Sequence, residues 1–117
     1  MSTFTKNKLS GSVNGKFIKI AAMATPGTLI HTAVSGITNW DEIYIFATNN
    51  DTVTRTLTIE WGGTTSPDDL VKNDLEIVKG EYLVIPGFVL QNGLIVRAFA
   101  SAANVIVVGG YVHNIVV

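Results

Sequence analysis

The chain has 117 residues, of which 47 % are hydrophobic and only 15 % are charged, with a net charge of −1 and no cysteine. This length fits one ordinary domain that has enough apolar material for a core. The lack of cysteine excludes a disulfide framework, a thiolate nucleophile and a cysteine-based zinc site. The β-branched residues, 14 Val, 12 Ile and 13 Thr, favour sheet over helix because their side chains pack well on a pleated surface.

Residues 1–15 are rich in Ser, Thr, Asn, Gly and Lys, and this composition predicts an extended or flexible N-terminal arm. From residue 16 onward, short strand-like runs alternate with turn signals and predict a single β-sandwich domain over residues 16–117. Pro86 and Gly87 are expected to stop one run, and the stretch QNG that follows it is a hairpin signal. The expected strands cover residues 16–22, 28–34, 40–48, 54–61, 70–78, 81–85, 94–100 and 104–115, with a further strand fragment at 88–90. The sequence predicts an all-β fold, an antiparallel β-sandwich or jelly roll of about eight short strands.

Several of the expected strands are apolar on both faces, among them the run 40–48. Ile43 and Ile45 lie on one face of the run 40–48, while Tyr44 and Phe46 lie on the other. A sandwich of two sheets has only one inner layer, so the second apolar face needs another cover. We therefore expect a homo-oligomer or a subunit on a larger assembly. The alternative is that bulged strands bury both faces within one chain.

Positive charge gathers near the N-terminus, because residues 1–40 contain no acid but do contain Lys6, Lys8, Lys16 and Lys19. Such a segment is either a solvated tail or a basic arm that docks on an acidic partner surface. It lacks the dense basic patch with interleaved aromatic residues that nucleic-acid binding requires. We expect neither a secretion signal nor a membrane-spanning segment, because no apolar run reaches 18 residues.

The two histidines, His31 and His113, belong to no catalytic or metal-binding motif. Each is expected to be a surface or interface residue. Most acids alternate with apolar residues, as on the solvent-facing side of a strand, so a paired-carboxylate site is not expected either. The sequence therefore predicts a non-enzymatic protein without a cofactor or bound metal.

The stretch WGGTTSPDD, from Trp61 to Asp69, is the most polar part of the strand-rich region. A phosphate cradle is excluded because no lysine follows the glycines. Asp68, Asp69 and Asp74 offer oxygen ligands for calcium, although without the spacing of an EF-hand. The favoured interpretation is a loop between strands, in which aspartate side chains cap backbone N–H groups.

Trp61 and Trp40 offer rings on which a sugar would stack, so a carbohydrate site is a further alternative. Trp61 continues the apolar face of the run 54–61, however, and is expected in the core or at its edge.

From Gly27 on, the chain contains in succession GTLIHTAV, WDEIYIFATNN, TLTIEWGGTTSPDD, YLVIPGFVLQNGLIVRAFA and NVIVVGGYVHNI. This overall pattern resembles small β-rich proteins of tailed-phage structural gene clusters, the capsid decoration (cement) proteins. The resemblance implies a compact sandwich that is often trimeric and sits on the outer surface of the phage head, and it carries no catalytic residues.

The resemblance and the apolar strand faces together predict a virion structural protein, a decoration subunit that stabilises the head by docking as an oligomer. The expected partners are copies of itself, in a trimer, and the major capsid protein or another virion structural protein, with no nucleic acid and no membrane. The alternatives are a lectin-like carbohydrate-binding module and a tail, neck or fibre adaptor with the same sandwich. The residues expected to contact a partner are Lys6, Lys8, Lys16, Tyr44, Phe46, Asp68 and Asp69.

Overall fold

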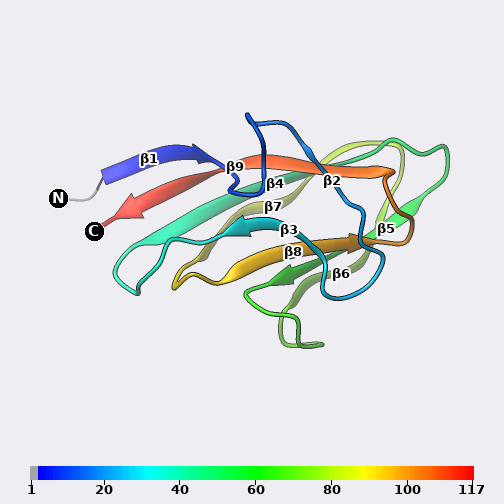
Figure 1. Cartoon of the computed structure of the whole chain (residues 1–117). Coiled ribbons are helices and arrows are strands. Elements are labelled where there is room, and N and C mark those ends of the chain that lie inside the picture. The colour runs from blue at the N-terminus through cyan, green and yellow to red at the C-terminus, as the bar shows by residue number, and fades with distance from the viewer. Residues whose placement is uncertain (1–2) are drawn as a thin grey trace.

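Two antiparallel sheets lie face to face in the computed structural model, which describes residues 3–117 (Figure 1). The five-stranded sheet has the order β1-β9-β4-β7, with β2 also paired to β9, and the four-stranded sheet has the order β3-β8-β5-β6. The strands are β1 (Thr3–Lys8), β2 (Ile18–Lys19), β3 (Thr28–Thr32), β4 (Trp40–Asn49), β5 (Arg55–Trp61), β6 (Leu70–Ile77), β7 (Gly80–Leu90), β8 (Ile95–Ala100) and β9 (Ile106–Val116). Residues 3–117 contain no helix, and hence none able to cross a membrane. The expected all-β sandwich is confirmed.

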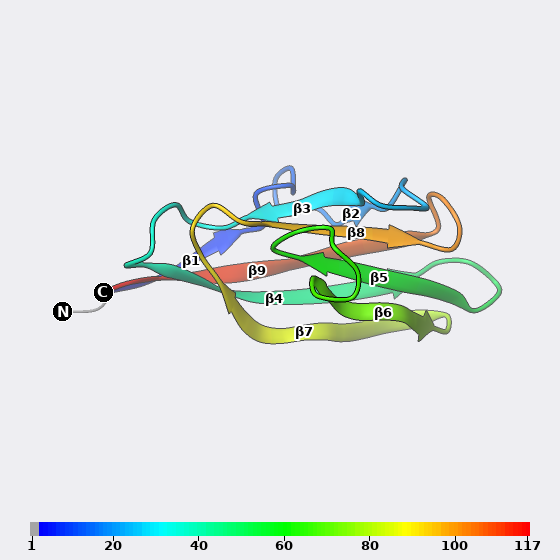
Figure 2. The same ribbon diagram turned by 90° about the horizontal axis from the view of Figure 1, so that it is seen from below.

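The connections follow a jelly-roll path. From β3 to β9, the chain passes to the facing sheet at every connection except the one between β5 and β6. Seen from below, the four-stranded sheet lies in front of the five-stranded one (Figure 2). Such crossing connections bury the inner faces of both sheets against each other and leave two outer faces.

The core lies between the two inner faces. In β4 every second residue is buried, and Ile43 and Ile45 are fully inaccessible to solvent. Leu57 and Ile59 of β5 are equally buried in the facing sheet. Full burial of one such side chain contributes about 1.5–3 kcal/mol relative to its exposure, so these alternating isoleucines and leucines drive the sheets together.

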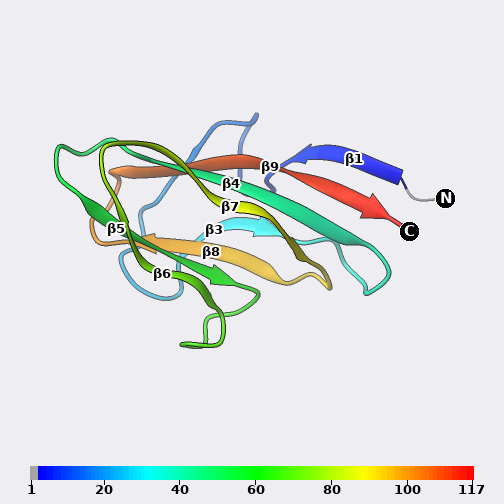
Figure 3. The ribbon, with the colours of Figure 1, turned by 180° about the vertical axis from the view of Figure 1, so that it is seen from behind.

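The flexible arm expected over residues 1–15 needs correction, because Thr3–Lys8 form strand β1 along β9. The start of β1 and the end of β9 lie at the same end of the molecule (Figure 3). All six side chains of β1 are exposed, whereas Leu9, the next residue, is buried in the core. The apolar pattern gave no sign of this strand because it is held by backbone pairing at a sheet edge. Met1 and Ser2 lie outside the described residues.

The expected stop at Pro86-Gly87 is also corrected, because β7 runs through both residues. Its pairing with β4 shifts register on either side of Pro86, which indicates two bulges. β7 is the edge strand of its sheet. The missing N–H of proline is tolerated at an edge, and a bulge absorbs the irregularity.

The outer face of the four-stranded sheet is partly covered by the chain itself. Glu60 of β5 points to this face yet is fully buried. Its carboxylate accepts a hydrogen bond from the backbone N–H of Gly27, at 2.7 Å, and another from the hydroxyl of Thr25. The loop that contains Thr25 and Gly27 therefore folds over β5, so that this part of the strand is buried on both faces within one chain.

Candidate functional site

The outer face of the five-stranded sheet carries aromatic side chains on neighbouring strands, and we call it the aromatic face. Pairing of β4 with β9 places Tyr44 beside Tyr111 and Glu42 beside His113. Because successive residues of a strand point to opposite faces, these side chains point away from the core that their neighbours fill. The aromatic face is formed by Lys6, Glu42, Tyr44, Phe46, Tyr111 and His113, with Leu83 and Val89 of β7 at its margin.

Tyr44 and Tyr111 stand side by side at the centre of this face. Their ring centroids are 4.9 Å apart with an interplanar angle of 22°, so the rings are stacked. The ammonium group of Lys6 lies 4.3 Å from the centroid of the Tyr111 ring. Since β9 runs between β1 and β4, Lys6 and Tyr44 cover opposite faces of Tyr111. The cluster thus presents ring edges and hydroxyl groups outward, and the faces of Tyr111 are already occupied.

Polar contacts among Tyr44, Glu42 and His113 hold the same cluster in place. The Tyr44 hydroxyl donates a hydrogen bond of 2.7 Å to Oε1 of Glu42, and Nδ1 of His113 lies 3.3 Å from that oxygen. The bond from Tyr44, followed by that with His113, lowers the pKa of Glu42 below its ordinary value because both favour the ionised carboxylate. The carboxylate in turn raises the pKa of Tyr44 by stabilising the protonated hydroxyl. The face therefore holds a charged acceptor at neutral pH.

Two glycines allow the rings to lie flat against the backbone. A Cβ atom on Gly87 of β7 would lie 2.9 Å from Cζ of Tyr44, and the φ angle of this glycine is +96°. A Cβ atom on Gly109 of β9 would overlap the ring of Phe17, which lies over that residue. Both positions need glycine because backbone and ring approach closely. Tyr44 is consequently held between Tyr111 on one side and β7 on the other.

The structure brings four of the residues expected to contact a partner onto one surface. Lys6 and Lys8 of β1 and Tyr44 and Phe46 of β4 all point to the outer side of the five-stranded sheet. The others lie elsewhere: Lys16 is in the connection between β1 and β2, and Asp68 and Asp69 are in the connection between β5 and β6.

The sequence did not place Glu42, Tyr111 and His113 on this face, although His113 was expected at the surface or at an interface. The available signal was alternation within each strand, which places Glu42 beside Tyr44 and Phe46 on one side of β4. The register between β4 and β9 was needed to bring Tyr111 and His113 to them, and alternation alone does not give that register.

The stretch Trp61–Asp69 is a hydrogen-bonded loop. The Asp69 carboxylate accepts the N–H of Thr65 at 3.0 Å, and the N–H of Trp61 donates to the Asp69 carbonyl at 2.7 Å. Asp69 thus caps backbone groups, as the loop interpretation expects. Within residues 3–117, no three side chains of the His, Cys, Asp or Glu types are grouped so as to hold a metal ion.

The tryptophans considered for sugar stacking occupy different positions. Trp61 is partly buried against the core, and its ring meets Phe88 edge-on with centroids 6.0 Å apart. Trp40 lines a hollow of about 340 Å³ together with Val89, Leu90 and Leu94. This hollow is lined mainly by apolar side chains, with Gln91 as its one polar side chain among the lining residues.

His31 is buried, which corrects its expected place at the surface or an interface. Its Nε2 atom lies 2.7 Å from Oδ2 of Asp41, and its Nδ1 accepts the backbone N–H of Ser10 at 2.9 Å. Because Nδ1 is an acceptor, the ring proton sits on Nε2 and is donated to Asp41. The pair joins β3 of one sheet to β4 of the other. A bulge in β3 turns both Ile30 and His31 inward, and strict alternation does not anticipate it.

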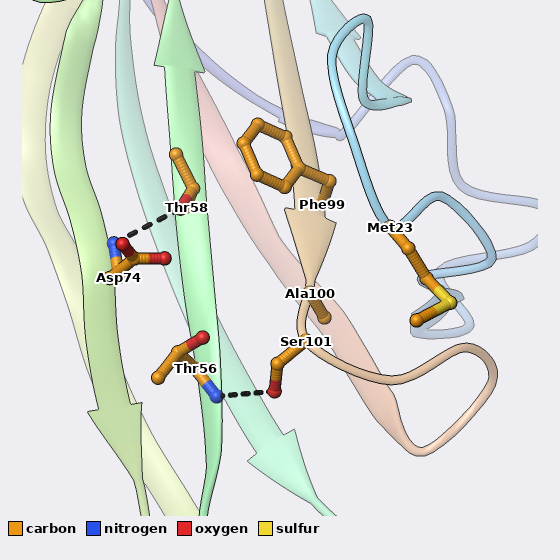
Figure 4. A pocket seen from close by; sticks show the side chains of 7 residues that line it. All are labelled: Met23, Thr56, Thr58, Asp74, Phe99, Ala100 and Ser101. Carbon is orange, nitrogen blue, oxygen red and sulfur yellow. Dashed lines mark hydrogen bonds between the residues drawn. The ribbon is translucent and has the colours of Figure 1, made fainter.

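A small hollow lies on the outer side of the four-stranded sheet (Figure 4). It has a volume of about 90 Å³, with Phe99 and Met23 on one side and Thr58 and Asp74 on the other. The Thr58 hydroxyl accepts the backbone N–H of Asp74 at 3.0 Å. This volume is suited to a few water molecules rather than to a drug-sized ligand, for which pockets of roughly 300–1,000 Å³ are usual.

No protein-family model, no curated protein and no solved structure matches this chain. The aromatic face combines partly exposed, stacked aromatic rings with charged groups on one surface.

Proposed function

We propose that this chain is a non-enzymatic structural subunit that binds protein partners through its aromatic face, and that it serves as a decoration subunit on the head of a tailed phage. The observation that carries this proposal is the cluster of Tyr44, Tyr111 and Lys6, whose stacked rings remain partly exposed on the outer face of the five-stranded sheet. Tyrosine is enriched at protein interfaces, where a ring with few rotatable bonds supplies contact area at a low cost in entropy.

The ring geometry favours a protein partner over a saccharide. A sugar ring stacks on an open aromatic face, but Tyr44 and Lys6 occupy the two faces of Tyr111. Tyr44 is itself enclosed between Tyr111 and Gly87. Ring edges and hydroxyl groups remain, and these suit shape-matched packing against another protein surface.

The histidine contacts favour a structural role over catalysis. His31 uses both ring nitrogens within the fold, and Nδ1 of His113 faces Glu42. Within residues 3–117, no serine or threonine hydroxyl is hydrogen-bonded to either histidine, although a hydrolytic triad needs such a pair.

The decoration role is the specific form suggested by the resemblance to phage cement proteins. Jelly rolls are common in viral capsid domains, but also in lectins, so the fold supports the role without deciding it. A subunit of this kind stabilises a shell by mass action, because it binds the assembled shell and not the dissociated one. Its place would be the head surface, with the major capsid protein or another virion protein beneath it.

The test uses heads of a tailed phage that encodes this chain, prepared with and without its gene. We expect heads that lack the chain to lose their DNA at a lower temperature, and purified chain to restore both occupancy and heat resistance. Tyr111→Ala should restore them poorly, while Phe99→Ala, an aromatic truncation on the opposite outer face, should restore them like the wild type. Heads that neither bind the chain nor change in heat resistance would rule out the decoration role.

A further inference from the structure

Charge is distributed unequally across the aromatic face. Antiparallel pairing aligns residues in rows that run across the strands, and one row contains Lys19, Val107, Thr48 and Glu81 from β2 to β7. Its base and its acid stand at opposite ends, and both are exposed.

A second row repeats this polarity. It contains Lys6, His113, Glu42 and Val89 from β1 to β7. The base Lys6 again lies on the side of β1, and the acid Glu42 lies on the side of β4. Between the two rows lies the apolar centre with Tyr111 and Tyr44.

We propose that this face packs against the same face of a second copy, about a two-fold axis that runs parallel to the strands between β9 and β4. Rotation about this axis places each row of one copy over the same row of the other copy, with the order of the strands reversed. Lys19 of one copy then faces Glu81 of the other, and His113 faces Glu42, each contact occurring twice. The paired Tyr44 and Tyr111 of one copy meet the same pair of the other copy at the centre.

A two-fold axis in the interface plane can run either parallel or perpendicular to the strands. The charge pattern favours the parallel axis. A two-fold axis perpendicular to the strands would place β1 over β1 and bring Lys6 and Lys8 of both copies together. Like charges at an interface are costly, so that arrangement is disfavoured. The selected arrangement also keeps the strands of the two copies nearly aligned, as in sheet-on-sheet packing with angles of about 30°.

The size of the face is sufficient for a dimer. Four strands spaced about 4.8 Å apart, each followed for about nine residues, cover on the order of 600 Å² in each copy. Counted over both copies, this area reaches the lower end of stable interfaces, which begins near 1,200 Å². An apolar centre with Tyr44, Tyr111 and Phe46, rimmed by charged groups, matches the usual composition of such an interface.

The test is the mass of the purified full chain in solution, measured by light scattering over a range of concentrations. We expect an equilibrium between one and two chains of 12.5 kDa each. Glu81→Lys and Lys19→Glu should each weaken the dimer about tenfold or more, because each places like charges together twice. The double variant, which exchanges the two charges, should recover most of the lost affinity.

Glu76→Lys is the matched control, because it makes the same charge change at an exposed position of β6 in the other sheet. It should dimerise like the wild type. Both interface positions are exposed, so folding of the variants is checked simply by their thermal unfolding.

The inference rests on the proposed function and names the partner of the aromatic face as a second copy of the chain, so a dimer takes the place of the expected trimer and docks on the head through another surface. The outcomes separate the two claims. A monomer at high concentration, a trimer, or a dimer that ignores the charge exchange would each overturn the two-fold arrangement. None of these results would by itself overturn the decoration role, which the heat resistance of the phage heads decides.

Discussion

Gly87 controls the position of the central ring of the aromatic face. Two separate features favour glycine at this position. Its φ is +96°, and an added Cβ would lie close to Tyr44 Cζ. Gly36 has a similar φ of +86°, but no atom lies within 4 Å of its Cβ position. Comparison of the two positions therefore isolates the contact with the ring.

We expect Gly87→Ala to reduce the free energy of unfolding by about 1–3 kcal/mol more than Gly36→Ala does, because the added methyl group overpacks against Tyr44. Chemical denaturation at one fixed protein concentration gives both values. Equal losses for the two variants would show that the backbone angle alone explains the glycine and that the ring is free to move.

Tyr44 also sets the ionisation of Glu42. Its hydroxyl is the largest contributor to the lowered pKa of that carboxyl. A carboxyl whose pKa is lowered in the folded state contributes stability above its unfolded pKa, and this contribution is lost as pH falls through the folded value.

Tyr44→Phe should therefore raise the pKa of Glu42 toward its ordinary value, as measured by NMR titration of the side-chain carboxyl. The stability difference from the wild type should be largest above the unfolded pKa and should shrink in acid. Tyr82→Phe is the control, because that hydroxyl lies on β7 away from Glu42. An unchanged Glu42 titration in Tyr44→Phe would mean that the hydrogen bond has no influence.

At the level of strands, β1 pairs with β9 and with no other strand of residues 3–117. All six of its side chains are exposed, including Phe4 with 67 % of its surface accessible. A strand held only by edge pairing belongs to the least stable part of a fold.

Deletion of residues 1–8 should therefore leave a folded domain with a modest loss of stability, whereas Leu9→Ala should cost about 2–5 kcal/mol because it empties a buried position. Thermal unfolding followed by circular dichroism measures both. If the deletion proved as damaging as Leu9→Ala, β1 would have to count as part of the core.

The sequence predicted the strands in which apolar and polar residues alternate regularly. It did not predict the strands whose presence or extent depends on backbone pairing with a neighbour. The bounds of β4 and β5 differ from expectation by one residue at one end, because Ile43, Ile45, Leu57 and Ile59 mark the inner face clearly. β1 has no apolar face to detect, and β7 passes through Pro86 because an edge strand tolerates it.

The Asn-Gly turn signal did not determine which strands it connects. Asn92 and Gly93 both have positive φ angles, as a tight Asn-Gly turn requires. They nevertheless connect β7 to β8, which lie in different sheets, so the turn is a crossing between layers rather than a hairpin. A local signal fixes the reversal of the chain but not the partner of the next strand.

The sequence predicted only the part of the candidate site that follows from alternation within one strand. Tyr44 and Phe46 were predicted to face away from the core because they alternate with Ile43 and Ile45. Tyr111 joined them only through the register of β9 with β4, which depends on long-range pairing.

At the scale of the whole molecule, the two outer faces differ in how they are covered. The loop through Thr25 and Gly27 closes over part of the four-stranded sheet and buries Glu60. On the aromatic face Phe17 lies over Gly109, whereas the stacked tyrosines remain partly exposed. This asymmetry is the reason to assign partner binding to the five-stranded sheet.

The most direct measurement of that assignment is hydroxyl-radical footprinting of the intact protein in dilute and concentrated solution, with light scattering to follow assembly. Tyr44 and Tyr111 should become protected as the protein assembles, while Met23, which is 58 % exposed over the other sheet, should react equally in both states. If the protein assembles while both tyrosines stay fully reactive, the aromatic face is not the surface through which it binds its partners.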